Sequence, residues 1–276
     1  MITFPNAKIN LGLDVVGRRP DGYHNLQSVM VPVGWRDILE IVPASGENTT
    51  LTVTGNSVNC PVEKNLVMKA YNLMASQVEL PPVDIYLRKI IPDGAGLGGG
   101  SADAAFTMVM LNSIFDLAYS SEQLAELSGT LGSDCPFFIY NRPMAVSGTG
   151  TCLSPIDVNL KGLYIVIVKP QVSVSTAEAY RGVKITSPKT SPAEIVTGMN
   201  VKAWHSARLK NDFEESVFAL HGEIEAVRNA LADSGAVYSS MSGSGSAVYG
   251  LFENDIMAEN AASQFSGCNV YCGEML

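Results

Sequence analysis

The stretch "PDGAGLGGGSADAAF", residues 92–106, decides the fold, because it places five glycines between positions 94 and 100, directly before a helical pattern of small residues. Glycine tolerates positive φ and close approach by other groups. An ordinary turn needs only one or two glycines, and each further one adds entropy to the unfolded chain. A structural turn therefore explains this run poorly, and the run indicates a ligand that lies close to the main chain.

A phosphate chain is the ligand that this pattern favours. Consecutive backbone N–H groups at a helix N-terminus form a preorganised anion site. We expect the main chain from Gly94 to Ala102 to hold the phosphates of a nucleotide, with Ser101 capping the helix. The run is not a Walker A loop, since no Gly-Lys-Ser/Thr occurs, and no His-Arg-Asp or Asp-Phe-Gly accompanies it as in protein kinases.

A dinucleotide site is the competing interpretation. Gly94, Gly96 and Gly99 satisfy the G-x-G-x-x-G pattern, and Asp116 follows at the distance typical of an oxidoreductase that binds NAD. That interpretation requires a second strand ending at Asp116. The residues before it, "ADAAFTMVMLNSIF", favour one continuous helix instead.

Composition narrows the classes of protein further. The chain has 276 residues, of which 46% are hydrophobic, enough for one large domain or two small ones. A net charge of −9 argues against nucleic acid or an anionic membrane surface as a partner. The longest apolar run, residues 162–168, is too short to span a bilayer, and no signal-peptide pattern is visible, so we expect a cytoplasmic protein.

The cysteines indicate no further chemistry. The five cysteines are scattered and lack Cys-x-x-Cys spacing, so they predict neither a disulfide framework nor a zinc site. No protein ligand set for a metal is expected elsewhere, and His205 and His221 are interpreted as incidental.

Strands and helices alternate along the chain without a regular βαβ rhythm, which predicts an α+β fold. Strands are expected at 7–17, 27–43, 49–55, 83–92, 162–170 and on both sides of the Ser/Gly turn within 236–252; helices are expected at 64–78, 101–115, after Ser120, and at 175–183, 206–220 and 222–236. We place a domain boundary near residue 155, giving domains 1–155 and 156–276.

Three segments together resemble the GHMP kinases, a family that includes galactokinase, homoserine kinase and mevalonate kinase. "PDGAGLGGGSADAA" is similar to the family's Pro-x-x-x-Gly-Leu-Gly-(Gly/Ser)-Ser-(Ser/Ala) motif, "AKINLGL" (7–13) to its first motif and "MSGSGSAVYGLF" (241–252) to its third. The resemblance implies an N-terminal nucleotide-binding α/β sandwich and a C-terminal ferredoxin-like α+β domain.

Other segments narrow the resemblance to one group within the family. "PNAKINLGLDVVGRRPDGYHNLQSVM", "EKNLVMKA", "LGSDCPFF", "VSTAEAY" and "NDFE" occur in the order found in kinases that act on a cytidine diphosphate sugar alcohol in non-mevalonate isoprenoid biosynthesis. This implies ATP-dependent phosphorylation of the acceptor's 2-hydroxyl, with ATP and Mg²⁺ as cofactors, by a monomer or weak homodimer. Cys135 stands where the family usually has valine, a change too small to put the site in doubt.

The resemblance also implies roles for individual residues. Asp134 matches the catalytic base and Lys8 its partner, although spacing alone favours an exposed turn aspartate and a strand-edge lysine. Tyr23 and His24 match residues that recognise cytosine, where an ordinary Pro-Asp-Gly turn is the plain alternative. The implied ATP-binding residues are Asn65, Lys89, Pro92, Asp93, Gly94, Ala95, Gly96, Leu97, Gly98, Gly99, Gly100, Ser101 and Ala102; the implied substrate-binding residues are Asn10, Tyr23, His24, Gly243, Ser244, Gly245 and Ser246.

Two functional alternatives stay open from the residues. Another GHMP kinase would act on homoserine or a mevalonate-type alcohol, but such an acceptor has no base to stack on Tyr23. A non-catalytic nucleotide sensor would be expected to lack Asp134 or Lys8, and both are present. For "SGSGS" (242–246), a flexible hairpin turn is the interpretation that the residues favour without the resemblance.

Overall fold

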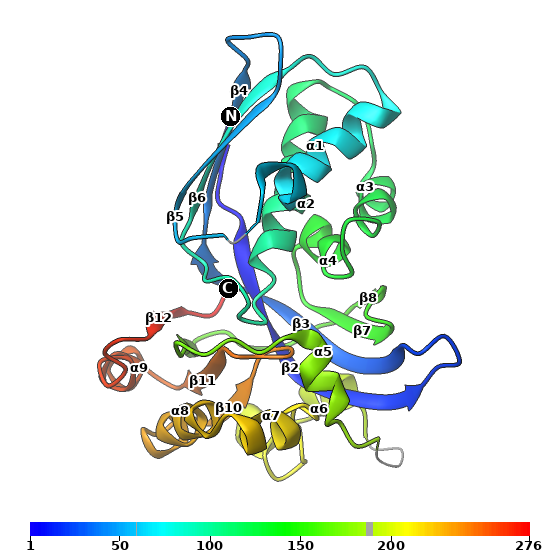
Figure 1. Ribbon diagram of the computed structural model, residues 1–276. Coiled ribbons are helices and arrows are strands. Elements are labelled where there is room, and N and C mark those ends of the chain that lie inside the picture. Colours follow the sequence, from blue (N-terminus) through cyan, green and yellow to red (C-terminus); the bar gives the residue numbers. More distant parts are fainter. Residues whose placement is uncertain (59, 186–189) are drawn as a thin grey trace. The chain divides into compact units, whose positions relative to one another are not determined.

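A computed structural model describes residues 1–58, 60–185 and 190–276, and its chain forms two compact units (Figure 1). Unit 1 comprises Met1–Ala7, Trp35–Asp93 and Gly98–Arg142, and unit 2 comprises Lys8–Gly34, Gly94–Leu97 and Pro143–Leu276. These are spatial units, and the predicted domain boundary near residue 155 stays a prediction. The glycine run contributes to both units.

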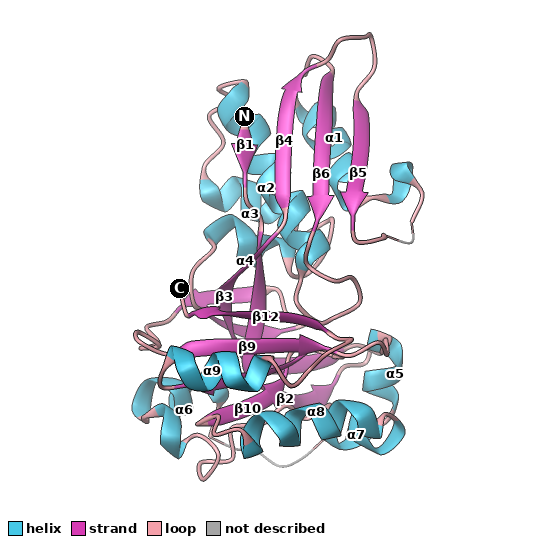
Figure 2. Ribbon diagram, turned by 90° about the vertical axis from the view of Figure 1, so that its left-hand side faces the viewer, coloured by secondary structure: helices cyan, strands magenta, loops and turns pink. Residues whose placement is uncertain are grey.

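Unit 1 contains one four-stranded sheet with its helices on one face (Figure 2). The strand order is β1-β4-β6-β5, and only the β5–β6 pair is parallel. Leu39, Ile85 and Leu87 of the sheet and Val67 and Met108 of the helices belong to one buried core, which fixes the helices against the strands. The elements are β1 (Ile2–Thr3), β4 (Ile38–Pro43), β5 (Thr50–Gly55), β6 (Val83–Lys89), a 3-10 turn at Val62–Lys64, α1 (Leu66–Gln77), α2 (Gly99–Ile114), α3 (Ser121–Ser128) and α4 (Cys135–Tyr140).

Unit 2 is built on two further sheets of four strands each, in the orders β2-β3-β7-β8 and β10-β11-β9-β12. In the second sheet every neighbouring pair is antiparallel, and α8 and α9 pack against it. The elements are β2 (Asn6–Arg18), β3 (His24–Arg36), β7 (Met144–Gly148), β8 (Cys152–Pro155), β9 (Tyr164–Lys169), α5 (Thr176–Arg181), α6 (Pro192–Gly198), a 3-10 turn at Val201–Ala203, α7 (Glu214–Leu220), α8 (Gly222–Asp233), β10 (Tyr238–Met241), β11 (Val248–Phe252), α9 (Asp255–Ala262) and β12 (Asn269–Glu274).

Most predicted elements are confirmed. The apolar strand at 162–170 is central in its sheet as β9, and the predicted capping box forms, with Ser120 and Gln123 exchanging both hydrogen bonds at the start of α3. The helix predicted for 206–220 is wrong in its first half. The main chain of Lys210 and Asp212 hydrogen bonds to Leu13 of β2, so these residues cannot continue a helix, which begins only at Glu214.

The dinucleotide interpretation is wrong on the point that it required. Helix α2 runs without interruption from Gly99 to Ile114, and Asp116 follows it in a turn with φ of 49°. Within the described residues no strand ends at Asp116. No described helix is long and apolar enough to cross a membrane.

Candidate active site

The glycine run connects β6 to helix α2. Gly94, Gly96 and Gly98 have φ of 61°, 72° and 71°, in the left-handed region that favours glycine. Gly98 is the N-cap and no side chain caps the helix, so the prediction that Ser101 does so is wrong: Ser101 is the third helical residue. The first-turn N–H groups consequently lack both an intrahelical acceptor and a side-chain cap.

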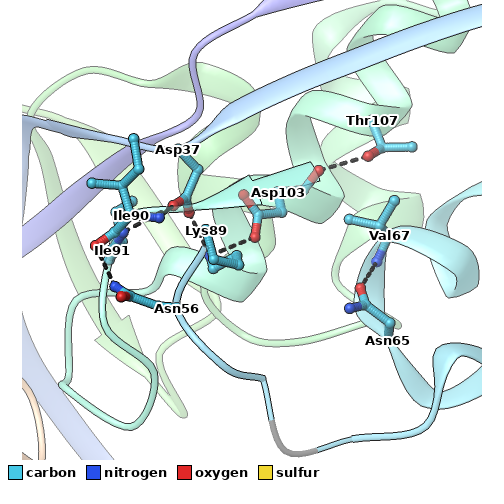
Figure 3. A network of polar contacts seen from close by, with 9 residues as sticks. All are labelled: Asp37, Asn56, Asn65, Val67, Lys89, Ile90, Ile91, Asp103 and Thr107. Carbon is cyan, nitrogen blue, oxygen red and sulfur yellow. Dashed lines mark hydrogen bonds and ion pairs between the residues drawn. The ribbon is translucent and has the colours of Figure 1, made fainter. Parts of the chain in front are cut away.

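A buried ion-pair network lies beneath this first turn (Figure 3). The Lys89 ammonium pairs with Asp37 and, at 2.7 Å, with Oδ2 of Asp103, and all three side chains are buried. Asp37 Oδ1 also accepts the N–H groups of Ile90 and Ile91. A Cβ built on Gly99 would lie 3.3 Å from Lys89 Nζ, so the ammonium touches the start of α2. The network thus fixes β6 against the helix, and the predicted nucleotide contact of Lys89 stays a prediction.

The two carboxylates of this network have unequal surroundings. Burial raises the pKa of Asp103 to about 7, because desolvation and the negative charge of Asp37 outweigh the attraction of Lys89. Burial opposes the charge of Lys89 too, but the two carboxylates raise its pKa overall. Asp103 Oδ1 has no hydrogen-bond partner among the described residues, whereas both Asp37 oxygens are bonded.

The unfolding free energy should therefore depend on pH through Asp103. Its pKa rises from 3.8 to about 7 on folding, so between these values the folded state holds more protons and stability falls as pH rises. Asp103→Asn removes this titration. We expect urea unfolding to show a smaller decline from pH 4 to 7 in the variant than in the wild type. Equal slopes would mean that Asp103 is ionised throughout.

Asn65 lies at the same end of the helices. It is the N-cap of α1, where its Oδ1 accepts the N–H of Val67 at 2.9 Å. A Cβ on Gly100 would lie 3.6 Å from the side chain of Leu66, so the first turns of α1 and α2 are neighbours. Asn65 is therefore placed beside the glycine run within unit 1.

Asp134 is brought to this region by the turn before α4. It is the half-buried N-cap residue of α4, and Cys135 follows it. A Cβ on Gly132 would lie 3.5 Å from Cys135 Sγ and 3.7 Å from Ser101 Oγ, which places this turn against the first turn of α2. Burial raises the pKa of the Cys135 thiol to about 11, so the thiol is protonated at neutral pH.

In unit 2 the carbonyl of Gly96 joins all three motifs of the resemblance. It accepts hydrogen bonds from Lys8 Nζ at 3.0 Å and from Ser242 Oγ at 2.9 Å. Lys8 Nζ also donates to Asn10 Oδ1 at 2.7 Å, and Asn10 donates to Ser28. Lys8 lies on β2, an edge strand of its sheet as the residues favoured, but its side chain is only 3% exposed, so a surface position is wrong. A buried ammonium needs such acceptors, and the arrangement supplies them from residues distant in sequence.

The Ser/Gly segment at 242–246 connects β10 and β11, so it is also the hairpin connection that the residues favoured. Asn211 Nδ2 donates to the carbonyls of Met241 and Gly243 at 2.9 and 2.7 Å. Glu214 Oε1 accepts from Met241 N and Ser240 Oγ, each at 2.7 Å. Asn211 and Glu214 were not predicted as functional, although both belong to the "NDFE" segment of the resemblance.

The remaining predicted residues are placed as follows. Ser244 Oγ lies 3.4 Å from Thr176 Oγ1, and Ser246 Oγ donates to the carbonyl of Val172. At the start of the glycine run Pro92 is buried and Asp93 is exposed. Among the described residues, no three His, Cys, Asp or Glu side chains are grouped so that they could hold a metal ion.

An aromatic pair marks the segment predicted to recognise a base. The rings of His24 and Tyr180 are stacked, with centroids 4.9 Å apart and planes at 20°, and Tyr180 packs edge-on against Phe213. Tyr23 is 68% exposed beside them in the chain. Sequence reasoning missed Tyr180, since only the folded chain brings α5 to the start of β3.

Replacing Gly96 by alanine tests the close contact between Gly96 and the main chain of Ser242. The new Cβ would lie 2.1 Å from the carbonyl oxygen of Ser242, and φ of 72° is unfavourable for alanine. We expect a loss of about 1–3 kcal/mol in unfolding free energy and a raised KM for ATP. Gly46→Ala, at a position with open space around it, is the control; a Gly96→Ala protein as stable as this control would contradict the prediction.

Comparisons with known proteins agree with this arrangement. The model of the GHMP kinases N terminal domain matches residues 65–142, and that of the GHMP kinases C terminal matches residues 194–270. A relative from Parabacteroides distasonis, named 4-diphosphocytidyl-2-C-methyl-D-erythritol kinase, is 48% identical over 275 residues, 100% of both chains. One from Bacteroides fragilis with the same name is 49% identical over 254 residues, covering 91% of this chain and 92% of its own.

Solved structures are similar over the whole chain. A crystal structure of 4-(cytidine 5'-diphospho)-2C-methyl-D-erythritol kinase has a TM-score of 0.84 and 32% identity, covering 99% of this chain and 98% of its own. Homoserine kinase from Cytophaga hutchinsonii, at 18% identity and a TM-score of 0.78, covers 100% of this chain and 94% of its own and shares the fold. The chain is a small-molecule kinase of the GHMP kinase family, with that family's two-domain α+β fold, and uses ATP.

Proposed function

We propose that the protein phosphorylates the 2-hydroxyl of 4-diphosphocytidyl-2-C-methyl-D-erythritol with ATP, giving the 2-phosphate and ADP, in non-mevalonate isoprenoid precursor biosynthesis. The observation that carries the proposal is the similarity over 100% of the chain to a relative of that name, at 48% identity. The stacked His24 and Tyr180 rings support an acceptor with an aromatic base.

The main chain at the glycine run fits the phosphates of ATP. Helix α2 has no side-chain cap, and positive φ at Gly94, Gly96 and Gly98 orients successive N–H groups in a way that side chains would hinder. ATP with Mg²⁺ supplies the transferable phosphoryl group and a neutralising cation. Since no described cluster of side chains could hold a metal by itself, we propose that Mg²⁺ is held chiefly by the phosphates.

We propose that Asp134 accepts the proton of the acceptor hydroxyl as its oxygen attacks. The residue lies on the turn that contacts Ser101 in the first turn of α2, and this supports its role near the transferred group. Lys8 is proposed to stabilise the negative charge that develops on the attacking oxygen. Lys8 belongs to unit 2 and Asp134 to unit 1, so their pairing stays a prediction.

The acceptor is proposed to lie against unit 2. Tyr23, His24 and Tyr180 would hold the cytosine, and Asn10 with the main chain of Gly243 to Ser246 would contact the rest of the acceptor. Asn211 donates to the carbonyl of Gly243 in this segment, and Glu214 accepts the N–H of Met241 just before it. We further propose a cytoplasmic protein that is a monomer or a weak homodimer.

The substitution His24→Ala should weaken binding of the acceptor and leave binding of ATP unchanged. Stacking on a base contributes about 1–3 kcal/mol, so we expect KM for the acceptor to rise by about 5- to 150-fold, with KM for ATP within about twofold of the wild type. His205→Ala is the matched control, since His205 lies outside this pair. Equal rises in both KM values would indicate a general loss of structure.

The proposed function is tested by measuring ADP release with ATP·Mg²⁺ and three acceptors in parallel: the cytidine diphosphate sugar alcohol, homoserine and mevalonate. Turnover with the cytidine-bearing acceptor alone is expected. Turnover with another alcohol would agree with the GHMP kinase family but would overturn the proposed acceptor. Binding of ATP without turnover on any acceptor would favour the sensor alternative.

A further inference from the structure

A cavity of about 750 Å³ lies within unit 2, and the proposed function does not use it. Its lining residues belong to β10, α8, the start of α7 and the turns at 205–210. A volume of this size accommodates a small metabolite rather than a single ion. The residues that carry the argument are His205, Arg208, Lys210, Glu214, Arg228 and Ser239.

The lining of this cavity is basic although the protein is acidic. Arg208, Lys210 and Arg228 line the cavity together with one carboxylate, Glu214, in a chain whose net charge is −9. Lys210 is paired with Asp212 at 3.3 Å, whereas neither arginine has an ion pair with a carboxylate among the described residues. Burial and then the charge of Arg228 lower the pKa of His205, so this positive charge acts on the cavity wall.

Two of the lining residues each carry a polar atom without a hydrogen-bond partner. Arg228 Nε and Ser239 Oγ are buried, and neither has a hydrogen-bond partner among the described residues. Such groups usually find a partner, because leaving one unsatisfied costs about 1–3 kcal/mol. Arg208 is also held at φ of 62°, a conformation that costs a non-glycine residue energy and that clusters at ligand sites.

We propose that this cavity binds a phosphorylated small molecule that also carries a hydroxyl group. Guanidinium groups match the oxygens of a phosphate in pairs, and two arginines with a lysine favour a doubly charged anion over a single carboxylate. Glu214 would repel a purely anionic ligand, so a hydroxyl donor is the group suited to the space beside it. The ligand class is thus a polyol phosphate.

The probe is glycerol 3-phosphate, titrated into the full-length protein with the nucleotide site occupied by a non-hydrolysable ATP analogue and Mg²⁺. Two measurements are made: titration calorimetry, and the ¹⁵N–¹H resonance of Arg228 Nε, assigned with Arg228→Gln. We expect a saturable shift of this resonance, and binding at least tenfold weaker in Arg208→Gln and in Arg228→Gln. Arg208 is exposed, so its variant retains the fold.

Lys161→Gln is the matched control, since it removes one exposed positive charge from unit 2 at a different cavity. Its affinity should stay within twofold of the wild type. The proposal is overturned if the Arg228 resonance does not shift saturably, if all three variants bind alike, or if acetate or glycerol binds as tightly as glycerol 3-phosphate.

Discussion

Asp134→Asn is expected to lower kcat by about a thousandfold, within the range of 10² to 10⁴ that general acid–base catalysis contributes. Asparagine has nearly the shape of aspartate but cannot accept the proton of the attacking hydroxyl. The residue lies half-buried at the N-cap of α4 and makes no side-chain cap bond there, so the substitution removes no helix cap. The measurement is steady-state ADP release with the cytidine-bearing acceptor.

Two controls separate lost chemistry from lost structure. The urea midpoint and the affinity for ATP should match the wild type, because the asparagine side chain keeps the packing of the turn. Asp233→Asn, which neutralises an exposed carboxylate at the end of α8, should retain full activity. A kcat within tenfold of the wild type in the Asp134→Asn protein would show that the proton leaves by another route.

Local patterns carry most of what the sequence predicts about the fold. The strand alternation around β4 and β6, the helical stripe of α1 and the Ser120–Gln123 capping box all act between near neighbours. The helix predicted across residues 206–213 fails because hydrogen bonds to Leu13, almost two hundred positions earlier, take over its backbone. Such non-local pairing leaves no mark in the local pattern.

The candidate site also has features that local patterns predict and features that they do not. Glycine spacing predicts that residues 94–100 bind phosphate, because positive φ and a main chain without side chains are properties of single residues. The supporting contacts are tertiary: Tyr180 against His24, Asn211 on the Ser/Gly segment, and Asp37 with Asp103 around Lys89. Each joins segments far apart in the chain, so spacing within one segment could not predict these contacts.

Lys89→Met is expected to destabilise the fold by about 3–5 kcal/mol, the cost of leaving buried charge without its partner. Asp37 and Asp103 would then face each other without a cation, while Asp37 Oδ1 still accepts two main-chain N–H groups. Urea unfolding at pH 8 measures the loss. Lys89 holds the pKa of Asp103 down to about 7, so in the variant Asp103 stays protonated to a higher pH, and the loss should shrink as the pH falls towards 7.

A second variant decides whether charge or packing causes this loss. The triple variant carries Asp37→Asn, Asp103→Asn and Lys89→Met, and so has no charge left in the network. It should recover most of the stability, because a neutral buried cluster carries no desolvation penalty for ions. A triple variant as unstable as Lys89→Met would show that the aliphatic packing of β6 against α2 dominates. The affinity for ATP, measured on the triple variant, then tests for a direct contact of Lys89 with the nucleotide. An unchanged affinity would leave Lys89 a structural role beneath the glycine run. A tenfold loss of affinity in a stable protein would assign Lys89 to the nucleotide site.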